Sequence, residues 1–244
     1  MGKPTVLMVG ADAGGVGKTT TARLLADYAD ARGMPLRTFD TEHPRGDLRR
    51  FRHDAEIVDI GSVTGQMRVF DSVDERAVTL VDIRAGLLSR TLKALNEAKF
   101  LDDNIDLVVC HVLGPKASSL DEIALAAKAI GGGASHRIVL NHPNDSEFQL
   151  GQDPEWADVF RSMKADAITI AKLSETATEK IQALGISFVN FTKNLTSAGT
   201  PAQYSRLLRG YTASWMESVW AEFDRVAVIK AAIGSTERRS ADRA

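Results

Sequence analysis

Residues 6–20 read Val6-Leu7-Met8-Val9-Gly10-Ala11-Asp12-Ala13-Gly14-Gly15-Val16-Gly17-Lys18-Thr19-Thr20. An apolar run of strand length ends at Gly10, a glycine-rich loop follows it, and an amphipathic stretch then continues to Arg32. A strand, a glycine loop and a helix in this order are typical of a segment that binds the phosphates of a nucleotide. This context favours a phosphate-binding loop over a surface turn that contains Lys-Thr by chance.

Each residue type in this loop suits one part of a triphosphate. Glycines let backbone amides approach the phosphate oxygens closely, and the start of the following helix adds the positive end of its dipole. Lys18 can reach the β and γ phosphates, and the hydroxyl of Thr19 can ligate a magnesium ion that bridges them. The residues predicted to bind nucleotide here are Gly14, Gly15, Val16, Gly17, Lys18, Thr19 and Thr20. The generic spacing GxxxxGK places Asp12 where its first glycine is expected, so the generic motif is incomplete.

The overall composition is that of an ordinary globular protein. Hydrophobic residues make up 44% of the 244 residues, charged residues make up 25%, and the net charge is -2. These values disfavour disorder and a strongly cationic nucleic-acid-binding protein. The only cysteine, Cys110, lies in an apolar run and is predicted to be a core residue, as a reducing cytoplasm permits. The apolar run that begins at Thr5 is too short for a signal peptide or a membrane span, so we expect a cytoplasmic protein.

Short apolar runs alternate with longer amphipathic stretches along the chain, which predicts parallel strands joined by crossover helices. The seven predicted strands are Thr5–Gly10, Leu36–Asp40, Ala77–Asp82, Asp106–Val112, Arg137–Asn141, Ala167–Ala171 and Ser187–Phe191. The fold class is therefore α/β, with a single doubly wound domain over residues 1–233. We expect a mostly parallel seven-stranded sheet with helices on both faces, followed by a polar tail over residues 234–244 that is disordered.

Helix boundaries carry local signals as well. Ser119 followed by Glu122 forms a capping-box pattern, and Gly185 is placed to end a helix that begins near Glu175. The last helix is predicted over residues 202–233, with one apolar side that packs on the core. That side consists of Leu208, Tyr211, Trp215, Val219, Val226 and Ile229.

Three segments together resemble the ParA/MinD family of ATPases, which have a deviant Walker A loop and belong to the SIMIBI class of P-loop proteins. Residues 14–20, GGVGKTT, resemble the family loop KGGVGKTT. Residues 39–47, FDTEHPRGD, resemble its DxDPxG segment, with Glu42 at the second acidic position and one residue inserted. Residues 78–86, VTLVDIRAG, resemble its strand-end motif DTPAG. The resemblance spans most of the chain and implies an ATPase that switches its interactions with partners.

The same resemblance implies roles for three carboxylates. Asp40 and Asp82 are expected to help to hold magnesium through its waters, and Glu42 to orient the water that attacks the γ phosphate. Carboxylates at the carboxyl ends of parallel strands lie beside the phosphate crevice, where oxygen ligands suit magnesium. The predicted catalytic residues are thus Lys18, Asp40 and Glu42, and the predicted metal ligands are Thr19, Asp40 and Asp82. For each carboxylate the alternative is a solvated acid that ends a strand.

Two further positions bear on the resemblance. Asn141 matches the place where the family often sets an asparagine against adenine, although an asparagine that forms a turn explains it equally well. Ala13 stands where the family has its signature lysine, which reaches across an ATP-sandwich dimer to the phosphate of the other subunit. A methyl group cannot supply that positive charge. We therefore expect binding of ATP and Mg2+, with weak hydrolysis and weak dimerisation unless another residue replaces the lysine.

The preferred function is an ATP-dependent switch for partitioning, positioning or transfer of DNA or a large cargo, with an unidentified protein partner and a nucleotide-dependent homodimer. Non-specific DNA binding would use basic side chains of the last helix, namely Arg206, Arg209, Arg225 and Lys230, for which a solvated helix is the alternative. Residues 235–243 have no apolar face for membrane attachment. Two other functions stay open: a metabolic SIMIBI ligase that resembles dethiobiotin synthetase, and a module that binds nucleotide without turnover.

Overall fold

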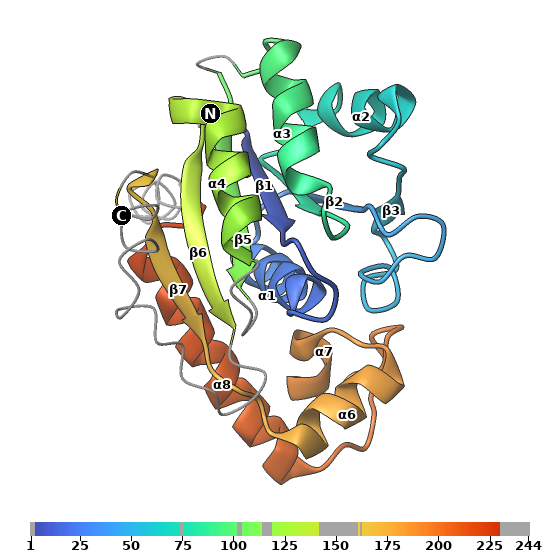
Figure 1. Ribbon diagram of the computed structural model, residues 1–244. Helices are drawn as coiled ribbons and strands as arrows, with labels where there is room; N and C mark the ends of the chain where they lie inside the picture. The colour runs from blue at the N-terminus through green and yellow to red at the C-terminus, as the bar shows by residue number, and fades with distance from the viewer. Residues whose placement is uncertain are drawn as a thin grey trace, which may run out of the picture.

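Parallel strands form the centre of the molecule. The computed structural model describes residues 3–73, 76–101, 104–113, 119–141, 161 and 163–229. Within these residues one seven-stranded sheet has the order β3-β2-β4-β1-β5-β6-β7, and every neighbouring pair of strands is parallel (Figure 1). The predicted α/β class and the predicted number of strands are confirmed.

The strands are β1 (Thr5–Gly10), β2 (Leu36–Asp40), β3 (Glu56–Ile57), β4 (Val78–Asp82), β5 (Asp106–Leu113), β6 (Ser135–Asn141) and β7 (Asp166–Ile170). The helices are α1 (Lys18–Ala31), α2 (Val63–Phe70), α3 (Leu88–Glu97), α4 (Ser119–Ile130), α6 (Glu175–Leu184), α7 (Phe188–Thr192) and α8 (Arg206–Arg225). A short 3-10 helix, Gly131–Gly133, precedes β6.

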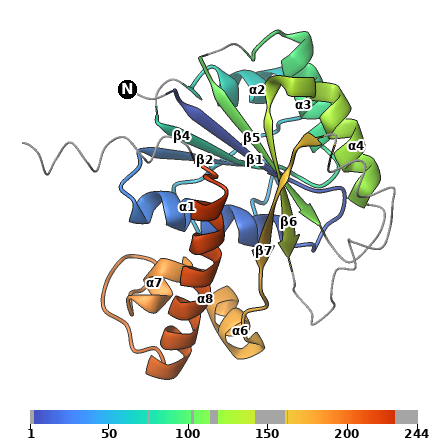
Figure 2. The ribbon, with the colours of Figure 1, turned by 90° about the vertical axis from the view of Figure 1, so that its left-hand side faces the viewer.

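Helices cover both faces of the sheet. Helices α2, α3 and α4 lie on one face, and α1 and α8 lie on the other, with α6 and α7 beside α8 (Figure 2). Every residue of β1 is buried, because this strand lies at the centre of the sheet and both of its faces are covered. Its side chains alternate between the two layers: Leu7 and Val9 pack with α1 and α8, and Val6 and Met8 pack with α2, α3 and α4.

The order of the strands creates a crevice at the carboxyl end of β1. The chain leaves β1 toward β2 and β3 on one side, returns to β4, and then continues to β5, β6 and β7 on the other side. Ligands of open α/β sheets bind at such a reversal of strand order. Asp82 of β4 is in register with Val9 of β1 on one side and with Asp40 of β2 on the other. The phosphate loop and both predicted carboxylates therefore meet at one edge of the sheet.

One predicted strand is wrong, and a different short segment makes up the number. Residues 187–191 contain α7, whose first turn is capped by the Oγ of Ser187 as it accepts a hydrogen bond from the backbone N–H of Asn190 (3.0 Å). An apolar run of this length is compatible with a strand or with a buried helix, so its periodicity could not distinguish them. The seventh strand is β3, whose two residues are too few to show an alternation.

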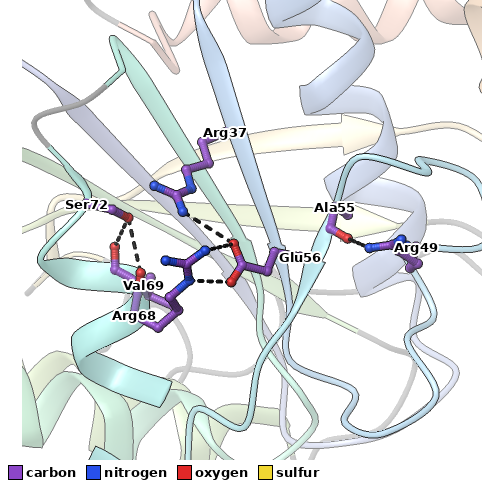
Figure 3. Close-up of polar contacts among 7 residues, drawn as sticks. All are labelled: Arg37, Arg49, Ala55, Glu56, Arg68, Val69 and Ser72. Atoms are coloured by element: carbon purple, nitrogen blue, oxygen red, sulfur yellow. Dashed lines mark hydrogen bonds and ion pairs between the residues drawn. The ribbon is translucent and has the colours of Figure 1, made fainter. Parts of the chain in front are cut away.

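The edge strand β3 is held by an ion cluster rather than by an extensive ladder. Figure 3 shows the guanidinium groups of Arg37 and Arg68 both in contact with the carboxylate of Glu56. The Nη2 of Arg37 lies 3.3 Å and the Nη2 of Arg68 lies 3.1 Å from Oε2 of Glu56. The Arg68 hydrogen bond is the largest effect on Glu56 and lowers the pKa of its carboxyl. Beside this cluster, Arg49 donates to the carbonyl of Ala55 (2.8 Å), which fixes the loop that joins β2 to β3.

The helix predictions have mixed outcomes. Gly185 ends α6 in the left-handed conformation (φ 60°), and Cys110 is buried, as expected. The last helix, α8, is shorter than predicted. The buried face of α8 consists of Thr212, Met216, Val219 and Phe223, so Tyr211 lies off this face and is 57% exposed. Glu122 accepts hydrogen bonds from the N–H and Oγ of Ser89 (2.9 and 3.1 Å).

Two predictions lie outside the described residues: the cap formed by the Ser119 side chain, and the tail over residues 234–244. None of the described helices is both long enough and apolar enough to cross a membrane.

Candidate phosphate-binding site

The glycine loop between β1 and α1 adopts a conformation that needs its glycines. Gly15 and Gly17 have φ values of 78° and 102°, which side chains with a Cβ rarely adopt. Gly17 immediately precedes α1, and its carbonyl accepts the N–H of Thr21 (2.9 Å). A Cβ added at Gly14 or Gly15 would meet nothing within 4 Å. The backbone of the loop therefore borders open space, as a loop that receives a ligand requires.

Lys18 and Thr19 lie in the first turn of α1, directly after this loop. The ammonium group of Lys18 donates to the carbonyl of Ala13 (3.2 Å), so the side chain folds back over the loop. The hydroxyl of Thr19 donates to Oδ2 of Asp82 at the end of β4 (2.8 Å). These contacts bring the two polar residues of the motif to the carboxyl edge of the sheet.

Asp82 is a buried carboxylate with spare capacity for hydrogen bonds. Its Oδ1 is buried and has no hydrogen-bond partner among the described residues. Burial raises the pKa of the Asp82 carboxyl to about 7, although the hydrogen bond from Thr19 opposes this change and the charge of Asp40 adds to it. A buried polar atom without a partner is unfavourable, because it has lost its hydration. Together with the Thr19 hydroxyl, this oxygen offers the hard ligands that magnesium prefers.

Asp40 organises the loop that follows β2. Its carboxylate is fully buried; Oδ1 accepts the N–H of Glu42 (3.0 Å) and Oδ2 accepts the N–H of Arg49 (2.9 Å). Both oxygens thus hold backbone of the loop that carries Glu42. The sequence did not predict this structural role, and the role of Asp40 toward magnesium stays a prediction.

Glu42 lies at the rim of the site and is paired with Arg84. The Nε of Arg84 is 3.5 Å from Oε1 of Glu42, and the side chains are 52% and 36% exposed. The backbone N–H of Arg84 donates to the hydroxyl of Thr41 (2.7 Å), and the N–H of Thr41 donates to the carbonyl of Asp82 (3.0 Å). The loops after β2 and β4 are therefore joined at this rim.

Asn141, at the end of β6, packs directly against the phosphate loop. Its Nδ2 donates to the carbonyl of Val16 (2.7 Å), and the residue is buried. A Cβ at Gly17 would lie 2.0 Å from this nitrogen. Asn141 therefore holds the loop backbone, a contact that neither the adenine interpretation nor the turn interpretation predicted.

No protein-family model matches the sequence, and no curated protein matches it. Among solved structures, the septum site-determining protein MinD from Pyrococcus horikoshii, complexed with Mg-ADP, aligns with a TM-score of 0.58 at 15% identity, over 92% of this chain and 97% of that one. The fold is MinD-like. The MinD cell division protein from Aquifex aeolicus aligns at 15% identity with a TM-score of 0.49, over 88% of this chain and 97% of that one. A nucleotide-binding protein from Archaeoglobus fulgidus, in complex with ADP, aligns at 18% identity with a TM-score of 0.46, over 74% and 86%.

Within this MinD-like fold, the predicted residues fall into two groups. Lys18, Thr19 and Asp82 come together at the end of β1 and β4, and Asp40 and Glu42 lie on the adjoining loop. Sequence reasoning missed the contacts of Thr41, Arg49 and Arg84. The sequence did contain a signal for Arg84, because this residue lies two positions after Asp82, in the segment that resembles the strand-end motif.

Proposed function

We propose that the protein is a magnesium-dependent ATP-binding switch of the ParA/MinD kind, which hydrolyses ATP to ADP and phosphate. The observation that carries this proposal is the contact between Thr19 and Asp82 (2.8 Å), formed beside Lys18 where β1 and β4 end. It joins the phosphate loop to the strand-end carboxylate, which are the two halves of a magnesium nucleotide site. The MinD-like fold agrees with the proposal.

The described residues fit a magnesium nucleotide. Open space borders Gly14 and Gly15, where amides of the loop would face phosphate oxygens. Thr19 would hold the metal directly, Asp40 and Asp82 would help to hold it through its waters, and Lys18 would neutralise phosphate charge. No group of three or more metal-binding side chains exists among the described residues. Bound magnesium would neutralise charge on the β and γ phosphates.

The remaining residues define the expected reaction. Glu42 is proposed to orient the attacking water from the rim of the site, where its side chain is accessible. Ala13 offers only a methyl group beside the phosphates, so we propose that hydrolysis and ATP-driven dimerisation are weak. The same observation favours a second candidate, a module that binds nucleotide without turnover.

The basic side chains of α8 bear on the proposed partners. We propose a cytoplasmic protein that acts on a protein partner and on DNA or another large cargo. On α8, Arg206 is exposed, whereas Arg209 donates to the carbonyl of Thr192 (3.3 Å) and Arg225 pairs with Glu222 (2.8 Å). Lys230 lies outside the described residues. Contacts to DNA phosphates through this helix would weaken steeply as the salt concentration rises.

The function is tested by calorimetry of the purified chain with ADP and ATP, in magnesium and in excess chelator. Lys18→Ala is expected to weaken nucleotide binding about 100-fold, because a charged hydrogen-bond donor to phosphate is lost. Lys93→Ala is the matched control, since Lys93 is exposed on α3. Equal affinities for the wild type and Lys18→Ala would contradict the proposal.

Phosphate release then separates the candidate functions. Slow release of phosphate from ATP alone supports the switch, and binding without any release supports the module. ATP consumption that requires a small carboxylate substrate would instead support a ligase.

A further inference from the structure

The site brings three carboxyl groups and two cationic groups together at the carboxyl edge of the sheet. Asp82, Asp40 and Glu42 supply carboxylates at the carboxyl edge of the sheet, and Lys18 and Arg84 supply the facing cations. A nucleoside triphosphate brings several more negative charges into this space. Negative charges that are partly removed from water repel one another strongly unless cations compensate them. Lys18 and bound magnesium would compensate part of this charge, and Arg84 is a further cationic side chain at the rim of the site.

The backbone of Arg84 is fixed between the two loops that border the phosphates. Just before it, the N–H of Ile83 donates to the carbonyl of Val9 (2.8 Å), and just after it, the N–H of Gly86 donates to the carbonyl of Ala11 (3.0 Å). Its own N–H donates to the hydroxyl of Thr41 (2.7 Å). The backbone of Arg84 therefore lies beside the first residues of the phosphate loop, and these hydrogen bonds fix its position.

The side chain of Arg84, in contrast, is free to exchange its partner. Its side chain is 52% exposed, and the 3.5 Å separation of Nε from Oε1 of Glu42 is longer than a good hydrogen bond. Ion pairs between exposed groups contribute little to stability and are easily replaced. Phosphate is a stronger partner, because a guanidinium can donate two parallel hydrogen bonds to its oxygens.

We propose that Arg84 binds the terminal phosphate of a nucleoside triphosphate and releases Glu42 from their ion pair when it does so. The inference rests on the proposed function. It makes Arg84 the residue that distinguishes a triphosphate from a diphosphate, and it links the phosphate to the loop after β2 through Glu42.

The test compares binding of ADP and of a non-hydrolysable ATP analogue, with magnesium, by calorimetry on the full chain. Arg84→Gln is expected to weaken binding of the analogue about tenfold and to leave the affinity for ADP unchanged. Arg84→Lys keeps the charge but loses the paired donors, so its loss is expected to be smaller. Arg90→Gln, at an exposed position of α3, is the matched control and is expected to bind both nucleotides as the wild type does.

A second variant changes the affinity in the opposite direction. Glu42→Gln removes the carboxylate that competes with phosphate for Arg84, while it keeps the size of the side chain. Binding of the analogue is expected to become about threefold tighter, with ADP affinity unchanged. This increase cannot result from a folding defect.

The outcomes separate the inference from the proposed function. If Arg84→Gln leaves the ratio of the two affinities unchanged, or weakens both nucleotides equally, the inference is overturned and the nucleotide switch stands. If the wild type binds neither nucleotide, the proposed function fails and takes the inference with it. If binding is selective for the triphosphate and Arg84→Gln abolishes only that selectivity, both are supported.

Discussion

The first turn and the middle of helix α1 use polar side chains in opposite ways. In the first turn, Lys18 donates to a carbonyl of its own loop and Thr19 donates to a carboxylate that has an oxygen to spare. Two turns later, Arg23 and Asp27 are buried against α7 and the loop before β3. The first group has partners that a ligand can replace, whereas the second is enclosed by protein.

The buried group contacts aromatic rings and backbone of other elements. The guanidinium of Arg23 lies between the rings of Phe51 and Phe188, 3.6 and 4.1 Å from their centroids, and it donates to the carbonyl of Ile186 (3.1 Å). Burial lowers the pKa of Arg23 to about 9 and raises that of Asp27 to about 6. Both pKa values move toward the neutral form, so loss of hydration outweighs the attraction between the charges.

This difference teaches how one helix serves both stability and binding. The buried charges attach the middle of α1 to α7, and this attachment positions the first turn without using its polar groups. Substitutions of the buried charges should therefore change stability, and substitutions in the first turn should change ligand binding.

The largest expected effect comes from Arg23→Ala. This change leaves Asp27 buried without its nearest cation and opens a gap between two aromatic rings. It should lower the free energy of unfolding by about 4 kcal/mol, as measured by urea denaturation. Lys18→Ala should change that free energy by less than about 0.5 kcal/mol. A reversed order of the two variants would break the comparison.

The next effect is a dependence of stability on pH that arises from Asp27. Burial is the main cause of its raised pKa, Asp30 adds to it, and the N–H of Val189, Arg23 and Arg52 oppose it. Because the folded pKa is above the unfolded value of about 3.9, the folded state holds the proton more tightly. The contribution of Asp27 to stability is therefore complete below pH 4 and is lost as pH rises to about 6.

Measurement of unfolding between pH 4 and pH 7 checks this sign. The wild type should lose on the order of 3 kcal/mol relative to Asp27→Asn across this range. Parallel curves for the two proteins would show that Asp27 does not titrate there.

The smallest effect concerns the residue before helix α1, where backbone strain rather than burial determines the loss of stability. Gly17→Ala places a Cβ at a φ of 102° and in contact with Asn141, so we expect a loss of about 2 kcal/mol. In an Asn141→Ala background the steric part is relieved, and the loss should fall to about 1 kcal/mol. Chemical denaturation of the four proteins of this cycle gives the coupling. An equal loss in both backgrounds would show that Asn141 does not pack on the loop as described.

Much of the fold was predictable because its signals are local. The strand before Gly10, the loop with Lys18 and the helix after it are encoded by adjacent residues, and so is the left-handed glycine at Gly185. The prediction for residues 187–191 was wrong because the apolar residues of this segment suit two structures; the helix is favoured by the cap of Ser187 and by packing of α7 against α1 and α8.

The sequence by itself determined that a glycine loop joins a buried strand to a helix, since backbone sterics and apolar spacing act over a few residues. It also placed Asp40 and Asp82 at the ends of strands. Tertiary structure alone decided that Asn141 would hold the loop, that Asp40 would bind the N–H of Arg49, and that Arg84 would pair with Glu42. Those partners meet only where separate strands end at one edge of the sheet, and no spacing along the chain encodes that meeting.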